Sequence, residues 1–247
     1  MRRFKKITIL EWKLLTREFI TIFFALIFPV MMLLLFGSIY GNEPNEFMNG
    51  YGIVDVSTPG YINMIVAVTG LMSLPLTLAQ YRERKILKRF MASPIHPMDI
   101  LLSQIIVNVM LTLIGLIMLI IVGIIVFDLK FYGNFFEALL AFIIIMLSIF
   151  SIGLFITAIS KNTRMANAIS YIIYFPMLFL SGATMPLELM PQTIRIISKA
   201  LPMTYGVELF KGIWLGDHLI DFSLELLLLG GITLLFGGLS IKLFKWV

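Results

Sequence analysis

Long apolar runs separated by short polar stretches dominate the chain. A helix needs about 20 mostly apolar residues to cross the hydrocarbon core of a bilayer, and six runs approach or exceed this length. They do not alternate between apolar and polar residues as the strands of a membrane barrel do. The pattern therefore predicts an all-α membrane protein that forms one transmembrane domain over residues 1–247. The six expected spans are Phe19–Tyr40, Tyr61–Gln80, Ser103–Phe127, Phe135–Ile159, Ala168–Met185 and Phe222–Phe244.

Composition supports this interpretation, and the charges add an orientation. Of the residues, 60% are hydrophobic and 13% are charged, against roughly a quarter charged in soluble domains. If the six spans are correct, 15 of the 19 Lys and Arg residues lie on one side. Cytoplasmic loops carry this excess, so both termini are expected in the cytoplasm. The net charge of +5 then reflects topology, and no nucleic-acid partner is expected.

The segment before the first span, residues 1–18, has apolar and basic residues on opposite sides at helical spacing. Its pattern favours an amphipathic helix in the cytoplasmic headgroup layer. Glu11 is an exception, because it falls on the apolar side. The alternative is a positively charged topology anchor. The following run is too long for a signal peptide and lacks a cleavage site, so this segment is expected to be retained.

A basic stretch follows the second span, and its apolar residues repeat at helical spacing. Ile86, Leu87, Phe90 and Met91 fall on one side, and Pro94 ends the pattern because proline disfavours helix in the residue before it. We expect a short amphipathic helix over about 82–93. A topology loop needs the charges but not this pattern, so the segment is interpreted as a docking element for a cytoplasmic partner.

The stretch between the fifth and sixth spans is interrupted by prolines. The apolar residues between Pro191 and Pro202 are too few to cross a bilayer, and such lengths are typical of re-entrant or interfacial helices. We expect a hairpin over about 186–201 on the outer side. A compact extracellular cap is the alternative.

Catalytic and metal-binding signatures are missing from the sequence. It contains no P-loop, no H-E-x-x-H and no G-x-S-x-G motif, so nucleotide hydrolysis, zinc proteolysis and serine hydrolysis lack their usual residues. With no cysteine and two distant histidines, no cofactor or metal is expected on this chain. No predicted span carries a charge at its centre, which disfavours an ion-coupled carrier.

The order of these parts resembles the ABC transporter type-2 permease family over essentially the whole chain. Two local motifs carry the resemblance. In the basic stretch, the matching residues are Glu83, Arg84, Leu87, Ala92, Ser93 and Pro94. In the outer stretch, they are Ser181-Gly182, Pro186-Leu187-Glu188, Met190-Pro191 and Leu201-Pro202. Lys85-Ile86 departs from the Gly-Thr that the family often has there, and Ser103-Gln104 from its Gly-Lys.

The resemblance implies the membrane subunit of a bacterial exporter in the cytoplasmic membrane. It implies a second permease subunit, identical or related, and two cytoplasmic ABC ATPase subunits that bind ATP-Mg in place of this chain. The residues expected to couple the ATPase to the permease are the matched residues of the basic stretch together with Phe90.

The same resemblance places spans one, two and five at the partner subunit and the transport pathway. Polar residues step along one side of the second span, and aromatic residues cluster in the fifth. The proposed pathway residues are Asn63, Thr69, Ser73, Thr77, Tyr171, Tyr174, Phe175 and Phe179. The alternative is that the small polar residues only hold helices together and that the aromatic residues face lipid.

The leading functional hypothesis is export of a drug, a peptide antibiotic or a lipid-like amphipathic cargo. A variant of it is export of a polysaccharide or teichoic acid. From a different class, the chain could be a membrane anchor or sensor subunit that binds a cytoplasmic protein without transporting anything.

Overall fold

The computed structural model describes residues 2–44, 48, 50–86 and 97–243, and in these residues it contains helices but no strand. The helices of the first half are α1 (Arg2–Leu15), α2 (Phe19–Ile22), η1 (Phe23–Ile27), α3 (Phe28–Tyr40), α4 (Ile53–Ala67), η3 (Val68–Ser73) and α5 (Leu74–Glu83). Those of the second half are α7 (Pro97–Phe127), α8 (Phe135–Ile159), α9 (Thr163–Leu180), η4 (Leu187–Leu189), α10 (Gln192–Ser198), α11 (Pro202–Leu215), η5 (Leu219–Phe222) and α12 (Ser223–Leu243).

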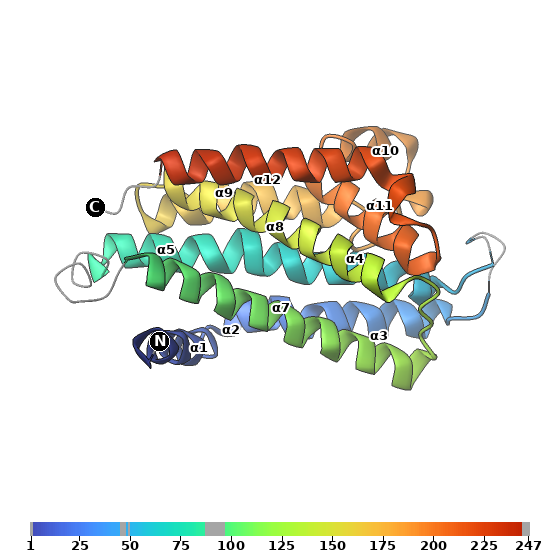
Figure 1. The fold of residues 1–247 in the computed structure, drawn as a ribbon. Helices are drawn as coiled ribbons and strands as arrows, with labels where there is room; N and C mark the ends of the chain where they lie inside the picture. Colours follow the sequence, from blue (N-terminus) through green and yellow to red (C-terminus); the bar gives the residue numbers. More distant parts are fainter. Residues whose placement is uncertain (1, 45–47, 49, 87–96, 244–247) are drawn as a thin grey trace.

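Five helical segments of the described chain are long and apolar enough to cross a membrane. They are Phe19–Tyr40, Ile53–Glu83, Met98–Phe127, Phe135–Ile159 and Leu219–Leu243. The segment predicted as the fifth span corresponds to α9, which has 18 residues and is not one of these five. It packs against α5 within the same bundle (Figure 1). The sixth crossing therefore stays a prediction.

The predicted boundaries of four spans differ from the observed helices. The third begins at Met98 rather than Ser103, and the sixth at Leu219 rather than Phe222. The second begins at Ile53 rather than Tyr61 and continues to Glu83, because Pro59 and Gly60 lie inside α4 instead of in a loop. The helix α9 begins at Thr163, where the side chain of Asn162 accepts a hydrogen bond from the backbone N–H of Met165 and caps the helix.

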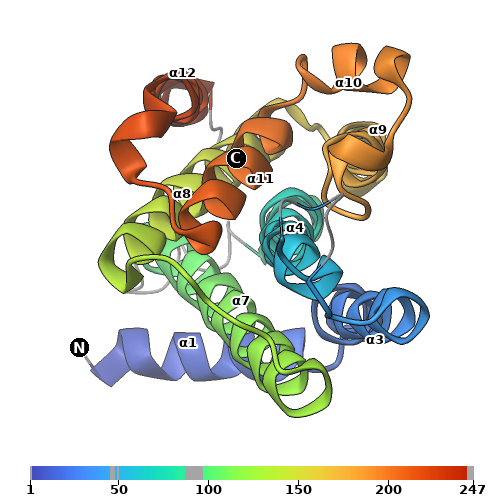
Figure 2. The same cartoon turned by 90° about the vertical axis from the view of Figure 1, so that its right-hand side faces the viewer.

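The helix formed by α4, η3 and α5 lies at the centre of the bundle (Figure 2). In the most apolar stretch of this central helix, 94% of the residues are buried. In the corresponding stretch of the segment that contains α12, the share is 6%. The other helices pack around the central helix, and α12 packs mainly on α8. Because the central helix is enclosed on all sides, its polar residues contact other helices of the same chain.

Two π-helical segments interrupt the first two spans. They are η1 and η3, and such segments are frequent at functional sites. In η3, Gly70 lies directly against Gly153 of α8, where an added Cβ would be 1.9 Å from the Gly70 carbonyl oxygen. Small residues at such crossings allow helix backbones to approach closely in membranes.

One end of the bundle gathers the elements that carry most of the basic residues. The helix α1 runs across the bundle axis there and packs on α7 (Figures 1 and 2). The end of α5, the start of α7, the turn between α8 and α9 and the end of α12 lie at the same end (Figure 1). We call it the basic end. Its position at the cytoplasmic surface stays a prediction, as does the interfacial position of α1.

The opposite end, here called the outer end, holds the stretch predicted as a hairpin. There α10 covers seven residues and packs on α9, whereas α11 is largely buried among α4, α8 and α12. The two helices lie at the right of Figure 1. Their depth in a membrane is not tested by these contacts.

Candidate functional site

The predicted coupling stretch is attached to the basic end by helices on both sides. Glu83 and Arg84 lie at the C-terminus of α5, and α7 begins at Pro97. The remaining predicted coupling residues lie outside the described part of the chain; these are Leu87, Phe90, Ala92, Ser93 and Pro94. Their role in coupling stays a prediction, and the site is built here from its flanks.

Two neighbouring residues at the end of α5 hold the turn between α8 and α9. The Arg82 guanidinium donates hydrogen bonds to the carbonyl oxygens of Thr157 and Ser160 at 3.0 and 2.8 Å. Cations stabilise a helix C-terminus, where carbonyl groups have no partner within the helix. The Glu83 carboxylate accepts a hydrogen bond of 2.9 Å from the backbone N–H of Thr163, the first residue of α9. The cation Arg82 thus binds the C-terminus of α8, and the anion Glu83 binds the N-terminus of α9. Together they join α5 to the α8–α9 turn.

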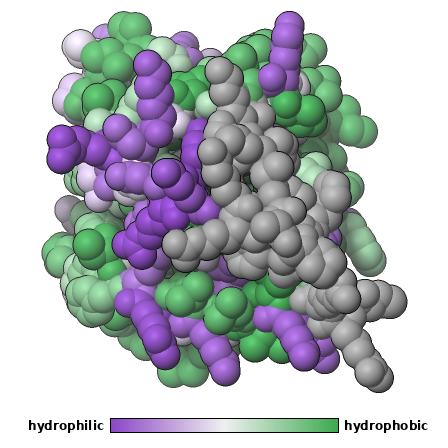
Figure 3. Space-filling model, turned by 90° about the vertical axis from the view of Figure 1, so that its left-hand side faces the viewer, coloured by the Kyte–Doolittle hydropathy of each residue, from purple (hydrophilic) through white to green (hydrophobic). Residues whose placement is uncertain are grey.

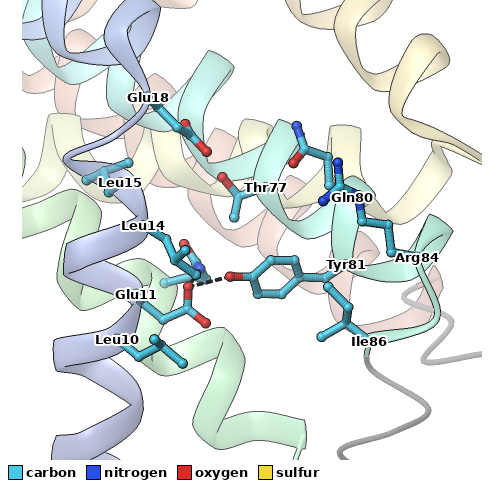
Figure 4. Close-up of a pocket in the computed structure, with 11 residues that line it drawn as sticks. Leu10, Glu11, Leu14, Leu15, Glu18, Thr77, Gln80, Tyr81, Arg84 and Ile86 are labelled. Carbon is cyan, nitrogen blue, oxygen red and sulfur yellow. Dashed lines mark hydrogen bonds between the residues drawn. The ribbon is translucent and has the colours of Figure 1, made fainter.

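A buried carboxylate joins α1 to both helices that flank the coupling stretch. Glu11 is 3% exposed, and its Oε2 accepts hydrogen bonds of 2.5 Å from the Tyr81 hydroxyl of α5 and from Nε2 of Gln104 in α7 (Figure 4). The residue that broke the amphipathic pattern of the first segment is therefore its attachment point. One side chain fixes the position of α1 relative to the second and third spans.

The environment of Glu11 also changes its protonation. Burial raises the pKa of its carboxyl group, the hydrogen bonds from Tyr81 and Gln104 oppose this effect, and the nearby charge of Glu18 adds to it. The net shift is upward. Burial likewise raises the pKa of Glu18, against the hydrogen bond that it accepts from Thr21. Both acids are therefore more easily protonated than an exposed glutamate.

Exposed cations surround this junction. Figure 3 looks onto the basic end and shows hydrophilic side chains over much of its surface. The exposed basic residues on and just after α1, after α5 and around the α8–α9 turn are Lys5, Lys6, Lys13, Arg17, Arg84, Lys85, Lys161 and Arg164. Such a surface suits an acidic protein face or anionic headgroups.

The proposed pathway residues divide into two groups by their surroundings. Those of the second span are buried within the chain, and Thr69 shares a hydrogen bond of 2.8 Å with Thr112 of α7. Tyr174 is buried as well, whereas Tyr171, Phe175 and Phe179 of α9 are exposed. Thr69 thus contributes to packing between helices, and the α9 aromatic residues form an open surface. The pathway role of the set stays a prediction, and the buried members are Asn63, Thr69, Ser73, Thr77 and Tyr174.

Sequence analysis missed several polar residues of the basic end. Tyr81 and Arg82 received no individual role, because they lie at a helix end where a polar residue is ordinary. Gln104 was noted only as part of a departure from the family motif. Glu11 carried a usable signal, since it was the acidic exception on an apolar face. Among the described residues, no group of three or more His, Cys, Asp or Glu side chains is placed to hold a metal ion.

Comparison with known proteins places this arrangement in a family. The sequence profile of the ABC-2 type transporter family matches residues 2–215. The probable multidrug ABC transporter permease YbhS of Escherichia coli K12 is 22% identical over 74% of this chain and 49% of its own length. The permease YbhR of the same strain, named in the same way, is 24% identical over 66% and 44%. The putative transport permease ycf38 of Cyanophora paradoxa is 24% identical over 78% and 68%.

The match includes α1, the helices on both sides of the coupling stretch, and the outer stretch through α11. The chain spans about half the length of the two Escherichia coli permeases, so their activities are not transferred with the family. The match covers well over half of this chain, which therefore belongs to the ABC-2 type transporter family as a membrane-spanning permease.

Proposed function

We propose that the chain is the transmembrane subunit of an exporter in the bacterial cytoplasmic membrane, driven by separate ABC ATPase subunits that bind at the basic end. The cargo is an amphipathic molecule such as a drug, a peptide antibiotic or a lipid. Two permease subunits pair in the assembly, and two ATPase subunits supply ATP-Mg chemistry that this chain lacks.

The observation that carries the proposal is the junction around the coupling stretch. Its N-terminal flank is bonded to the α8–α9 turn through Arg82 and Glu83, and both flanks are bonded to α1 through Glu11. A force on the stretch would therefore act on α1, α5, α7 and the turn between α8 and α9 together. An element that only anchors a cytoplasmic protein does not require this connection.

The amphipathic cargo is supported by the composition of the bundle and by the names of the relatives. The described spans carry few charges, so a strongly charged cargo would meet little complementary charge within them. The two Escherichia coli relatives are named as probable multidrug permeases. We infer the same broad class for this chain.

The test is to replace an apolar residue of the coupling stretch by a charged one. Leu87→Asp and Phe90→Asp should each reduce co-purification with the proposed ABC ATPase subunit, or abolish the response of ATP hydrolysis to cargo. Lys161→Ala is the matched control, since Lys161 is an exposed basic residue of the basic end that lies outside the stretch. Full assembly and coupling in both Asp variants would contradict the docking role.

A transport assay with the same complex distinguishes an exporter from an anchor. An exporter moves cargo across the bilayer of sealed vesicles when ATP is supplied, whereas an anchor binds its partner without transport. ATP-dependent accumulation of a fluorescent amphiphile in inverted vesicles is the expected result. Binding of the ATPase without such accumulation for any amphiphile would favour the anchor.

A further inference from the structure

A cavity of about 380 Å³ lies between α1, α5 and α7 at the basic end. Its volume falls within the range of ligand pockets in proteins. Figure 4 shows side chains from α1 on one wall and from α5 on the other, with Glu11 and Tyr81 joined across it. The cavity is separate from the proposed pathway residues apart from Thr77, which contributes to its lining.

The wall of this cavity contains a carboxylate oxygen without a protein partner. Glu11 is nearly completely buried, and both of its hydrogen bonds are accepted by Oε2. Its Oε1 accepts none from the described residues, although an ionised carboxylate has capacity for several. Oε1 is not one of the fully buried polar atoms of the described chain that lack a partner, so it is reached from the cavity. A donor within the cavity can therefore bond to it.

The charged side chains that line the cavity favour a cation as that donor, although the other exposed cations of the basic end lie outside this lining. Two carboxylates line it, those of Glu11 and Glu18, against one guanidinium, that of Arg84. No ion pair joins these three side chains within the described structure. When both carboxylates are ionised, one positive charge on a ligand would balance the excess negative charge.

The remaining lining fits an apolar chain. Leu10, Leu14 and Leu15 of α1 and Ile86 beyond α5 contribute aliphatic surface. Leu10 and Leu14 are both exposed to a substantial degree, so a bound chain would cover apolar surface now in contact with solvent or lipid. Burial of this surface adds affinity in proportion to its area.

We propose that this cavity is a binding site for an amphiphile with a single ammonium group, which Glu11 and Glu18 hold while the apolar chain lies along Leu10 and Leu14. The ammonium donates to Oε1 of Glu11. Ligand binding thereby occurs next to the carboxylate that joins α1 to the flanks of the coupling stretch. The site is independent of the ATPase, since every lining residue belongs to the permease.

The test is photoaffinity labelling of the purified permease in phosphatidylglycerol nanodiscs with an alkylammonium that carries a diazirine. We expect saturable labelling of peptides that contain residues 10–18 and 77–86, with competition by octylammonium but not by octanoate or octanol. Added ethanolamine phospholipid distinguishes the source of the ammonium. Competition by this lipid identifies a membrane lipid as the occupant, and its absence identifies a free amphiphile; both results support the site.

Three variants make the test specific. Glu11→Gln keeps the shape of the side chain but removes its charge, and should raise the half-saturating concentration by at least about tenfold, the change typical of a lost charge-assisted hydrogen bond. Leu14→Trp should block labelling by filling the cavity. Glu43→Gln removes an exposed carboxylate at the outer end and should have no effect.

Non-saturable labelling, or saturable labelling unchanged by both Glu11→Gln and Leu14→Trp, would overturn the proposal. If Glu11→Gln fails to fold, Glu18→Gln and Leu14→Trp provide the same comparison. The side chains of Glu18 and Leu14 make no hydrogen bond to the described residues of α5 or α7, so these variants should fold. Labelling needs no ATPase. Loss of the site therefore leaves the exporter assignment intact, and failure of ATPase binding leaves the site intact.

Discussion

Each end of the bundle is organised around a buried carboxylate, but the two carboxylates are satisfied to different degrees. At the outer end, Asp55 is 1% exposed. Its Oδ1 accepts hydrogen bonds from the Asn42 amide and the Lys130 backbone N–H, and its Oδ2 accepts one from the Tyr132 hydroxyl. At the basic end, Glu11 has two donors on one oxygen and a cavity beside it.

This difference indicates which end is fixed and which is adaptable. The Asp55 network joins the start of α4 to the loops before it and after α7, and the neighbouring backbone bonds to α11 through Tyr132 and Trp214. All its donors have partners, so rearrangement would break several hydrogen bonds at once. The Glu11 junction has unused hydrogen-bonding capacity and free volume. We infer that the outer end is rigid and that movement begins at the basic end.

The largest effect is expected at the outer end. Asp55→Ala leaves the Asn42 amide, the Lys130 N–H and the Tyr132 hydroxyl without their acceptor, and should lower the free energy of unfolding by about 3 kcal/mol. Thermal unfolding of the purified permease in detergent measures the loss. Asp128→Asn is the control, because the side chain of Asp128 is 88% exposed and asparagine tolerates its positive φ of 53°. Equal stability of the two variants would remove the claim of a rigid outer end.

A smaller effect is expected where the two ends are connected through the middle of the bundle. In Gly153→Ala, the new methyl group would overlap the Gly70 carbonyl oxygen and push α8 away from η3. Such overpacking should lower stability by about 2 kcal/mol. Gly230→Ala on α12 adds the same methyl where nothing lies within 4 Å, and should change stability little. A tolerated Gly153→Ala would show that the crossing relaxes more easily than a close backbone contact allows.

The smallest expected effect is a difference between the two ends in how their carboxylates make stability depend on pH. At the outer end, burial raises the pKa of Glu188, but the hydrogen bond and charge of Lys211 outweigh it and hold the pKa below its ordinary value. Its contribution to stability is present above the ordinary carboxyl pKa and is lost as the pH falls through the lowered value. For Glu11, whose pKa is raised, stability is greatest below the ordinary pKa and is lost as the pH rises through the raised value.

The measurement is stability against pH for two charge-neutral variants. Glu188→Gln should reduce the loss of stability on acidification below the ordinary carboxyl range. Glu11→Gln should reduce the loss that accompanies a rise in pH above that range. The Glu188 effect should be at most about 1 kcal/mol, because the Glu188 side chain is 53% exposed and solvent screens its ion pair. If both variants changed the pH dependence of stability in the same direction, the environments assigned to Glu188 and Glu11 would be contradicted.

The sequence predicted the helices well, because runs of about 20 apolar residues have few other folds available to them. It placed the start of the second span too late, since Asp55, Pro59 and Gly60 resemble a loop until their packing is known. Pro59 is accommodated inside α4, where every residue after Ile53 is buried. Local composition does not reveal such enclosure by neighbouring helices.

The site was predictable only in part, for a related reason. The patterned basic stretch follows from spacing along one segment, and the resemblance to the family indicated Glu83 within it. The contacts of Arg82 with the α8–α9 turn, and those of Glu11 with Tyr81 and Gln104, join residues 70 to 93 positions apart. Periodicity within one helix contains no information about such distant partners. Only the misplaced charge of Glu11 indicated that α1 has a polar neighbour.

The central claim is that the ATPase binds at the basic end, and single-cysteine cross-linking tests it most directly. The chain contains no cysteine, so Arg84→Cys and Glu43→Cys each introduce one exposed attachment point, at the basic and the outer end respectively. With a photoreactive maleimide on the purified complex, we predict that Arg84→Cys cross-links to the ATPase subunit and Glu43→Cys does not. Cross-linking from Glu43→Cys with none from Arg84→Cys would contradict the account.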